Sequence, residues 1–113
     1  MSQFVYLYRR PTQPAATPQQ MQQTLQKWRA WFGDLEAKGH LAALGQPLDN
    51  TSGGVVKDAK GSFSDGPYAE TKDIVIGYSL VEATDLRHAM QLATGCPVYE
   101  QDGMVEVRPV MKM

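Results

Sequence analysis

The run from Ser64 to Asp73, SDGPYAETKD, holds the densest group of chemically useful side chains in this sequence. Its first carboxylate, Asp65, has two possible uses. It can accept backbone N–H groups and shape an Asx-turn before Gly66 and Pro67, or it can serve as a general base that faces a cleft. The second use requires apolar neighbours that raise a carboxyl pKa, and Tyr68 is one such neighbour in the run.

Glu70 and Lys72 lie in the same run and carry opposite charges. Glu70 either clamps the loop or acts as a second acid/base, since a turn can bring residues five positions apart together. Lys72 is close enough to neutralise either carboxylate. The alternative is a solvated cluster of charges, which is common on protein surfaces.

His40 and Tyr78 are the candidate catalytic partners of Asp65. The imidazole of a histidine titrates near neutral pH, which suits proton transfer. The alternative for His40 is a partly exposed side chain that is favoured by the negative end of the preceding helix. His88 lies opposite the apolar stripe of a predicted helix, so we expect it at the surface.

Glu106 and Arg108 share one face of the last predicted strand, because side chains alternate along a strand. They form an ion pair or a dimer contact, or Arg108 binds a carboxylate or phosphate through both guanidinium nitrogens. The single cysteine, Cys96, follows a predicted helix C-terminus, which disfavours a thiolate and indicates a structural role. Metal-ligand spacings, a GxGxxG motif, a P-loop and a nucleophile elbow are lacking, so no metal and no cofactor are predicted.

The composition narrows the class of protein. A chain of 113 residues is predicted to form one domain, 1–113. Eleven basic residues balance twelve acidic ones, which argues against a nucleic-acid partner and gives no reason to expect membrane attraction. One cysteine and the lack of a long apolar run fit a cytoplasmic protein.

The hydrophobic pattern predicts strands and helices in a regular order. Thr17 and Gln20 have the spacing of a capping box with proline between them, and Gly39 suits the end of that helix. The inner stripe of a second helix is predicted to hold Leu86, Ala89, Met90 and Ala93. The predicted elements are a strand at 3–8, a helix at 17–38, a strand at 40–48, a hairpin at 55–64, a strand at 73–81, a helix that begins at Thr84 or Asp85 and ends near 95, and a hairpin that joins 98–100 to 104–110.

This order predicts a ferredoxin-like βαββαβ α+β sandwich with an antiparallel sheet. Two helices cover only one face of such a sheet, yet the strand at 73–81 is apolar on both. Ile74, Ile76, Tyr78 and Leu80 are predicted on one side, with Val75 and Val81 on the other. A half-exposed sheet should alternate apolar with polar residues, so an identical subunit is the simplest cover, with room for a ligand cavity.

The sequence resembles the YCII-related family, in particular its DGPF-motif branch. The motif reads DGPYAETK at 65–72, with Tyr68 in the place of the usual Phe. The matches also include GHLAALGQPL at 39–48, GCP at 95–97 and VEVRPVM at 105–111.

The resemblance implies a dimeric α+β barrel and several functions. The first is a small-molecule binding or sensing dimer with a cleft near Asp65. An alternative is a cofactor-independent enzyme (a lyase, isomerase or monooxygenase) with Asp65 as general base, assisted by His40 or Tyr78. A second alternative is a regulatory partner of a transcription factor, because family members often accompany sigma factors. The residues predicted to bind the ligand are Asp65, Gly66, Pro67, Tyr68, Glu70 and Arg108.

Overall fold

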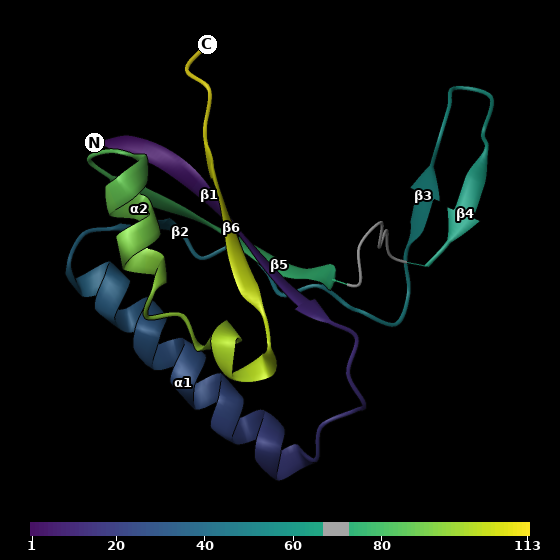
Figure 1. Ribbon diagram of the computed structural model, residues 1–113, viewed down its shortest axis with the longest axis horizontal. Helices are drawn as coiled ribbons and strands as arrows, with labels where there is room; N and C mark the ends of the chain where they lie inside the picture. The colour runs from purple at the N-terminus through teal and green to yellow at the C-terminus, as the bar shows by residue number, and fades with distance from the viewer. Residues whose placement is uncertain (67–72) are drawn as a thin grey trace.

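The computed structural model describes residues 1–66 and 73–113 of the chain. Within these residues the chain forms two α-helices, one 3-10 helix and strands that assemble into a four-stranded and a two-stranded sheet (Figure 1). The elements are β1 (Ser2–Pro11), α1 (Pro18–Ala37), β2 (Leu41–Ala43), β3 (Gly54–Val56), β4 (Phe63–Asp65), β5 (Asp73–Ala83), α2 (Leu86–Ala93), the 3-10 helix η1 (Pro97–Gln101) and β6 (Met104–Pro109).

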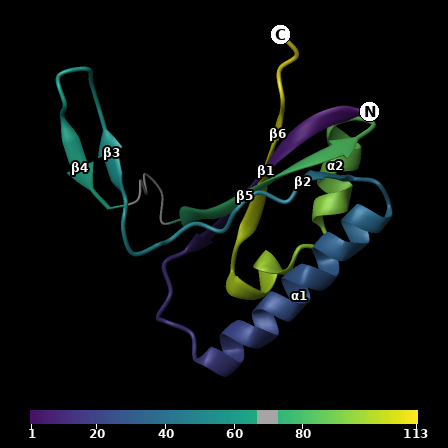
Figure 2. The same ribbon diagram turned by 180° about the vertical axis from the view of Figure 1, so that it is seen from behind.

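The main sheet has the strand order β2-β5-β1-β6, and every neighbouring pair is antiparallel. Both helices pack on the same face of this sheet, where they meet the inward side chains of β1. The two views of the molecule show β3 and β4 as a separate hairpin on the far side of the sheet from α1 (Figures 1 and 2). The predicted ferredoxin-like α+β fold is confirmed.

The core forms because β1 points an aromatic residue inward at every second position. Phe4, Tyr6 and Tyr8 are buried, as the alternation along a strand requires. The Tyr6 ring stacks on Trp31 at a centroid distance of 6.1 Å, and Tyr8 meets Trp28 edge-on at 4.9 Å. Such ring pairs each contribute about 0.5–1.5 kcal/mol beyond their burial, so the aromatic cluster fixes α1 on the sheet.

α1 begins and ends at the predicted signals. Gln20 N–H donates to Thr17 Oγ1 at 3.1 Å, and Thr17 N–H donates to Gln20 Oε1 at 3.0 Å, which completes the capping box. Gly39 has a φ of +79°, the left-handed conformation expected after a helix. The apolar residues along one side of α1 are buried only in its C-terminal half, since Met21 and Leu25 stay exposed.

A β-bulge in β5 makes the predicted alternation of that strand wrong. Tyr8 pairs with Gly77 and Arg9 with Val75, so Ile76 is an extra residue between two regular stretches. One extra residue reverses the phase of the side chains beyond it. Ile74 is therefore buried and Ile76 packs against the core, whereas Tyr78, four residues after Ile74, is exposed.

The strand predicted at 40–48 is shorter than expected. β2 ends at Ala43, and Gly45 then takes a φ of +73°, which is the left-handed region that favours glycine. The chain nevertheless stays beside β5. Tyr78 N–H donates to the Gln46 carbonyl at 3.3 Å, and Leu48 N–H donates to the Ile76 carbonyl at 2.9 Å.

The hairpin predicted between 98–100 and 104–110 is also wrong. Residues Pro97–Gln101 form the 3-10 helix η1, and β6 pairs with β1 instead. A Cβ on Gly103 would lie 2.4 Å from Val98 Cγ2 and 2.5 Å from the Arg9 carbonyl oxygen. The Asp102–Gly103 pair therefore allows the close approach of η1 to β1 and does not form a two-residue hairpin turn.

α2 is capped by Asp85, whose Oδ1 accepts the His88 N–H at 2.8 Å. Ala89 and Ala93 are buried, as predicted, but Leu86 and Met90 are exposed and not inward as the pattern suggested. Small alanines let the helix approach the sheet closely, so only a narrow stripe of this short helix is covered.

Candidate functional site

The face of the main sheet opposite the helices has an apolar centre. Val5 pairs with Leu80 and Leu7 with Tyr78, and paired residues share a face. The side chains of Val5, Leu7 and Leu80 are half-buried, and Tyr78 is 40% exposed. We call these four residues the bare face. They correspond to the second apolar surface that the sequence predicted.

A row of charges borders the bare face along β6. Glu106 pairs with Leu7 and Arg108 with Val5, which places both on the same side of the sheet as the bare face. Glu106 Oε1 lies 3.3 Å from Arg9 Nη1, and its Oε2 lies 3.6 Å from Arg108 Nη1. The predicted Glu106–Arg108 ion pair is confirmed. One carboxylate between two guanidinium groups leaves this row with a net positive charge.

A chain of hydroxyl groups behind the bare face holds the segment next to Tyr78. Tyr8 Oη donates to Ser79 Oγ at 2.9 Å, and Ser79 Oγ donates to the Leu44 carbonyl at 2.7 Å. Ser79 is fully buried. Burial raises the pKa of Tyr8 above its usual value, so this phenol stays protonated and acts as a structural donor.

Asp65 and Gly66, the described part of the acidic motif, lie on the β3–β4 hairpin. Asp65 is exposed and pairs with Gly54, and the Gly66 N–H donates to the Gly53 carbonyl at 2.8 Å. The other predicted members of this group lie outside the described residues; they are Pro67, Tyr68, Glu70 and Lys72.

The structure does not bring the three predicted catalytic residues together within one chain. His40 lies near the Ala83 end of β5, where its carbonyl accepts the Glu82 N–H. Asp65 belongs to the hairpin beyond the Asp73 end (Figure 1), and a strand of this length spans about 33 Å. Tyr78 is on the bare face between these ends. Their proposed cooperation in catalysis stays a prediction.

His40 and His88 form a contact that the sequence reasoning missed. Their rings lie 5.1 Å apart and are nearly perpendicular. His40 Nδ1 donates to the Glu82 carbonyl at 2.9 Å, and the Thr84 N–H donates to His88 Nδ1 at 3.1 Å. The sequence places these residues 48 positions apart, and the hydrogen bond from the Glu82 N–H to the His40 carbonyl brings His40 to the end of β5 that precedes α2.

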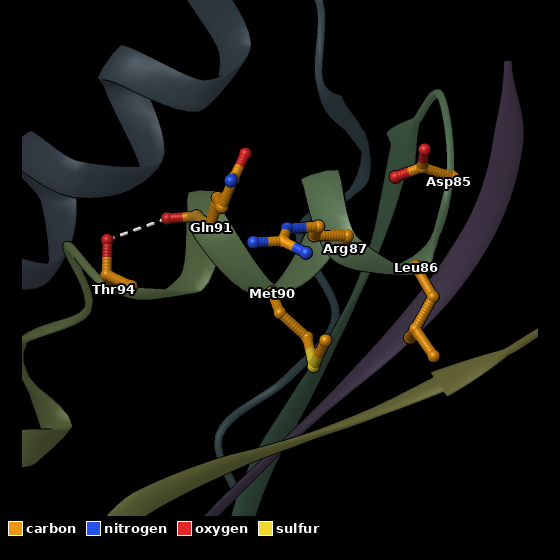
Figure 3. A pocket seen from close by; sticks show the side chains of 6 residues that line it. All are labelled: Asp85, Leu86, Arg87, Met90, Gln91 and Thr94. Atoms are coloured by element: carbon orange, nitrogen blue, oxygen red, sulfur yellow. Dashed lines mark hydrogen bonds between the residues drawn. The ribbon is translucent and has the colours of Figure 1, made fainter.

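Two shallow grooves lie outside the bare face. The larger, about 720 Å³, runs along α2 and is open to solvent. Figure 3 shows Leu86 and Met90 pointing to one side of the helix, toward β6, with Arg87 and Gln91 along the adjoining surface. The second groove, about 600 Å³, lies between α1 and η1 and reaches Cys96. Burial raises the pKa of the Cys96 thiol to about 12, which supports the predicted structural role.

Residues 1–66 and 73–113 contain no group of three or more His, Cys, Asp or Glu side chains arranged to hold a metal ion. In the same part of the chain, no helix is both long enough and apolar enough to cross a membrane.

The strand order, the two helices on one face and the bare opposite face define a ferredoxin-like α+β protein. The chain belongs to the YCII-related domain family, whose model matches residues 1–113. A search among curated proteins finds no match.

Proposed function

We propose that the protein is a cytoplasmic homodimer that binds a small organic anion on the bare face. The observation that carries the proposal is the juxtaposition of an apolar floor with a positively charged border. Val5, Leu7 and Leu80 offer apolar surface, and Tyr78 adds an aromatic ring with a hydroxyl group. Small-molecule sites have this composition, mostly apolar with a few polar groups that fix orientation.

The charge row selects the kind of ligand. Arg108 is 67% exposed on its side chain and shares Glu106 with Arg9, so its guanidinium keeps donors for another group. A guanidinium binds a carboxylate through two parallel N–H donors. The proposal is therefore that the ligand has an apolar body and one carboxylate.

The second subunit supplies a cover for the bare face that the described part of one chain does not form. A sheet with an apolar face in water favours association, since burial of that face contributes about 25 cal/mol per Å². Packing of two such faces against each other encloses the space beside Arg108. The single, buried cysteine fits a reducing cytoplasm.

A thermal-shift experiment with matched ligands tests the proposal. Benzoate, salicylate and octanoate are compared with benzamide and octanamide, which keep the apolar body but lack the charge. A ligand at ten times its dissociation constant stabilises the folded state by about 1.4 kcal/mol. At least one carboxylate should raise the melting temperature, and its amide should not.

Two arginine variants locate the effect. Arg108→Gln should abolish the carboxylate-induced shift, and Arg29→Gln, an exposed arginine on α1, should preserve it. The proposal fails if no carboxylate shifts the melting temperature, if the amides act equally, or if Arg108→Gln retains the full response.

A further inference from the structure

We infer that the β3–β4 hairpin is a dimerisation arm that packs against a second copy of this chain. The inference rests on the proposed homodimer and adds which segment holds it together. We define the arm as residues 53–66. Figures 1 and 2 show it standing clear of both helices and of the main sheet in opposite views.

Each described hydrogen bond of the arm joins two residues that both belong to the arm. β3 and β4 pair over three residues each, from Gly54–Asp65 to Val56–Phe63. Lys57 N–H donates to the Ser62 carbonyl at 2.6 Å near the tip. At the base, the Gly66 N–H donates to the Gly53 carbonyl at 2.8 Å.

Such a hairpin is not stable by itself. Two strands without a third strand or a packed helix are only marginally stable in water. Strands of three residues are also at the short end of the lengths found in sheets. Val56 is 67% exposed. Glycines at 53, 54, 61 and 66 increase the entropy that the ordered arm loses. The arm therefore needs a packing surface that the described residues, 1–66 and 73–113, do not provide.

The total exposed area of the chain indicates what packs against the arm. The chain exposes 8000 Å², whereas a compact monomer of 12.5 kDa exposes about 6,200 Å². The excess of about 1,800 Å² lies within the range of about 1,000–2,500 Å² that each subunit buries in an obligate homodimer. The radius of gyration, 15.4 Å, likewise exceeds the value of about 13 Å for a compact domain of this length.

The shape and the charges fit an identical partner. The molecule is a slab of 44 × 43 × 19 Å, so two copies packed face to face form a body of more equal dimensions. The border of the bare face carries both signs of charge, in Arg9, Glu106 and Arg108. A two-fold contact can match such a row with itself, and the net charge of −1 opposes association little. In this arrangement Asp65 of each chain lies against the other chain.

Sedimentation equilibrium of the full chain tests the role of the arm. Val56→Asp should raise the dimer dissociation constant at least tenfold. Val56→Thr keeps the β-branched shape and should change the constant less than threefold. Leu25→Asp is the matched control, because Leu25 is an exposed apolar residue on α1, outside the arm and the bare face, and it too should change the constant less than threefold.

Hydrogen exchange provides a second readout that does not depend on a variant. The Lys57 and Gly66 amides should exchange slowly in the concentrated wild-type protein and rapidly after dilution below the dissociation constant. One outcome overturns the role of the arm alone: the wild type is dimeric, Val56→Asp is also dimeric, and the two amides exchange at rates that do not depend on concentration. In that case the proposed dimer stands without the arm. A wild-type chain that is monomeric at all concentrations overturns both.

Discussion

Gly45 illustrates how a single residue controls the border of the bare face. It combines a φ of +73° with a Cβ position only 1.8 Å from the Tyr78 carbonyl oxygen. Neither the backbone angle nor the space permits a side chain. The close approach lets the 44–48 segment hydrogen-bond to β5 beside Tyr78.

Gly45→Ala should therefore destabilise the protein. Strain in the left-handed region alone costs about 1–3 kcal/mol, and the overlap with β5 adds to it. Gly33→Ala is the matched control, since Gly33 lies within α1 with open space around its Cβ position. The control should stabilise by about 0.5–1 kcal/mol. Urea-induced unfolding measures the free energy of unfolding of both variants. Equal changes in the two variants would refute the conclusion that position 45 requires glycine.

Cys96 should be unreactive in the folded protein. Its thiol is buried and its pKa is raised to about 12, so little thiolate forms at pH 8, and the thiolate is the reactive species. Ellman's reagent should label wild type only as fast as it unfolds. Ser52→Cys, at an exposed position, should add one thiol that reacts at once, and rapid labelling of wild type would contradict the prediction.

Residue types alone predicted part of the candidate site. The Glu106–Arg108 pair followed from strand alternation, and Tyr78, which lies on the bare face, was named as a possible assistant of Asp65. The contact of His40 with His88 was not predictable, because it depends on the pairing of the His40 backbone with the end of β5. The separation of Asp65 from His40 depends on the path of the hairpin, which short-range patterns do not encode.

At the scale of elements, local signals were reliable where they act within a few residues. The capping box of α1 was predicted from Thr17 and Gln20, and it is present with both hydrogen bonds. The bulge at Ile76 was missed because β-branched residues fit either face of a strand. η1 was read as a strand for a related reason, since Val98 and Tyr99 favour strands while tertiary packing decides their conformation.

The cap of α2 gives a test at this scale. Asp85→Ala should cost about 1 kcal/mol, the usual loss for an N-cap side chain, because the His88 N–H loses its acceptor. Asp85→Asn retains an oxygen acceptor and should stay within a few tenths of a kcal/mol of wild type. Chemical unfolding measures the free energies. If alanine and asparagine behave alike, the side-chain cap does not stabilise the helix.

At the scale of the whole molecule, buried phenol and thiol groups make stability dependent on alkaline pH. Burial raises the pKa of Cys96 to about 12 and raises the pKa values of Tyr6 and Tyr8. Above about pH 9 the unfolded chain releases these protons while the folded chain retains them. The unfolded state then binds fewer protons, so the free energy of unfolding falls as pH rises.

Urea unfolding between pH 8 and 11 measures this dependence. Each group contributes a slope of at most about 1.4 kcal/mol per pH unit, and the contribution of Cys96 begins at the lowest pH. Cys96→Ala should therefore show a shallower decline than wild type between pH 9 and 11. A decline identical to that of wild type would mean that the thiol does not take part.

The hydrogen-bonded chain Tyr8–Ser79–Leu44 also constrains the order in which relatives can have diverged. Tyr8→Phe removes one donor while Ser79 still donates to the Leu44 carbonyl. Ser79→Ala, if it came first, would leave the buried Tyr8 phenol without its acceptor, at a cost of about 1–3 kcal/mol. Lineages that carry alanine at position 79 should therefore have passed through an ancestor with phenylalanine at position 8.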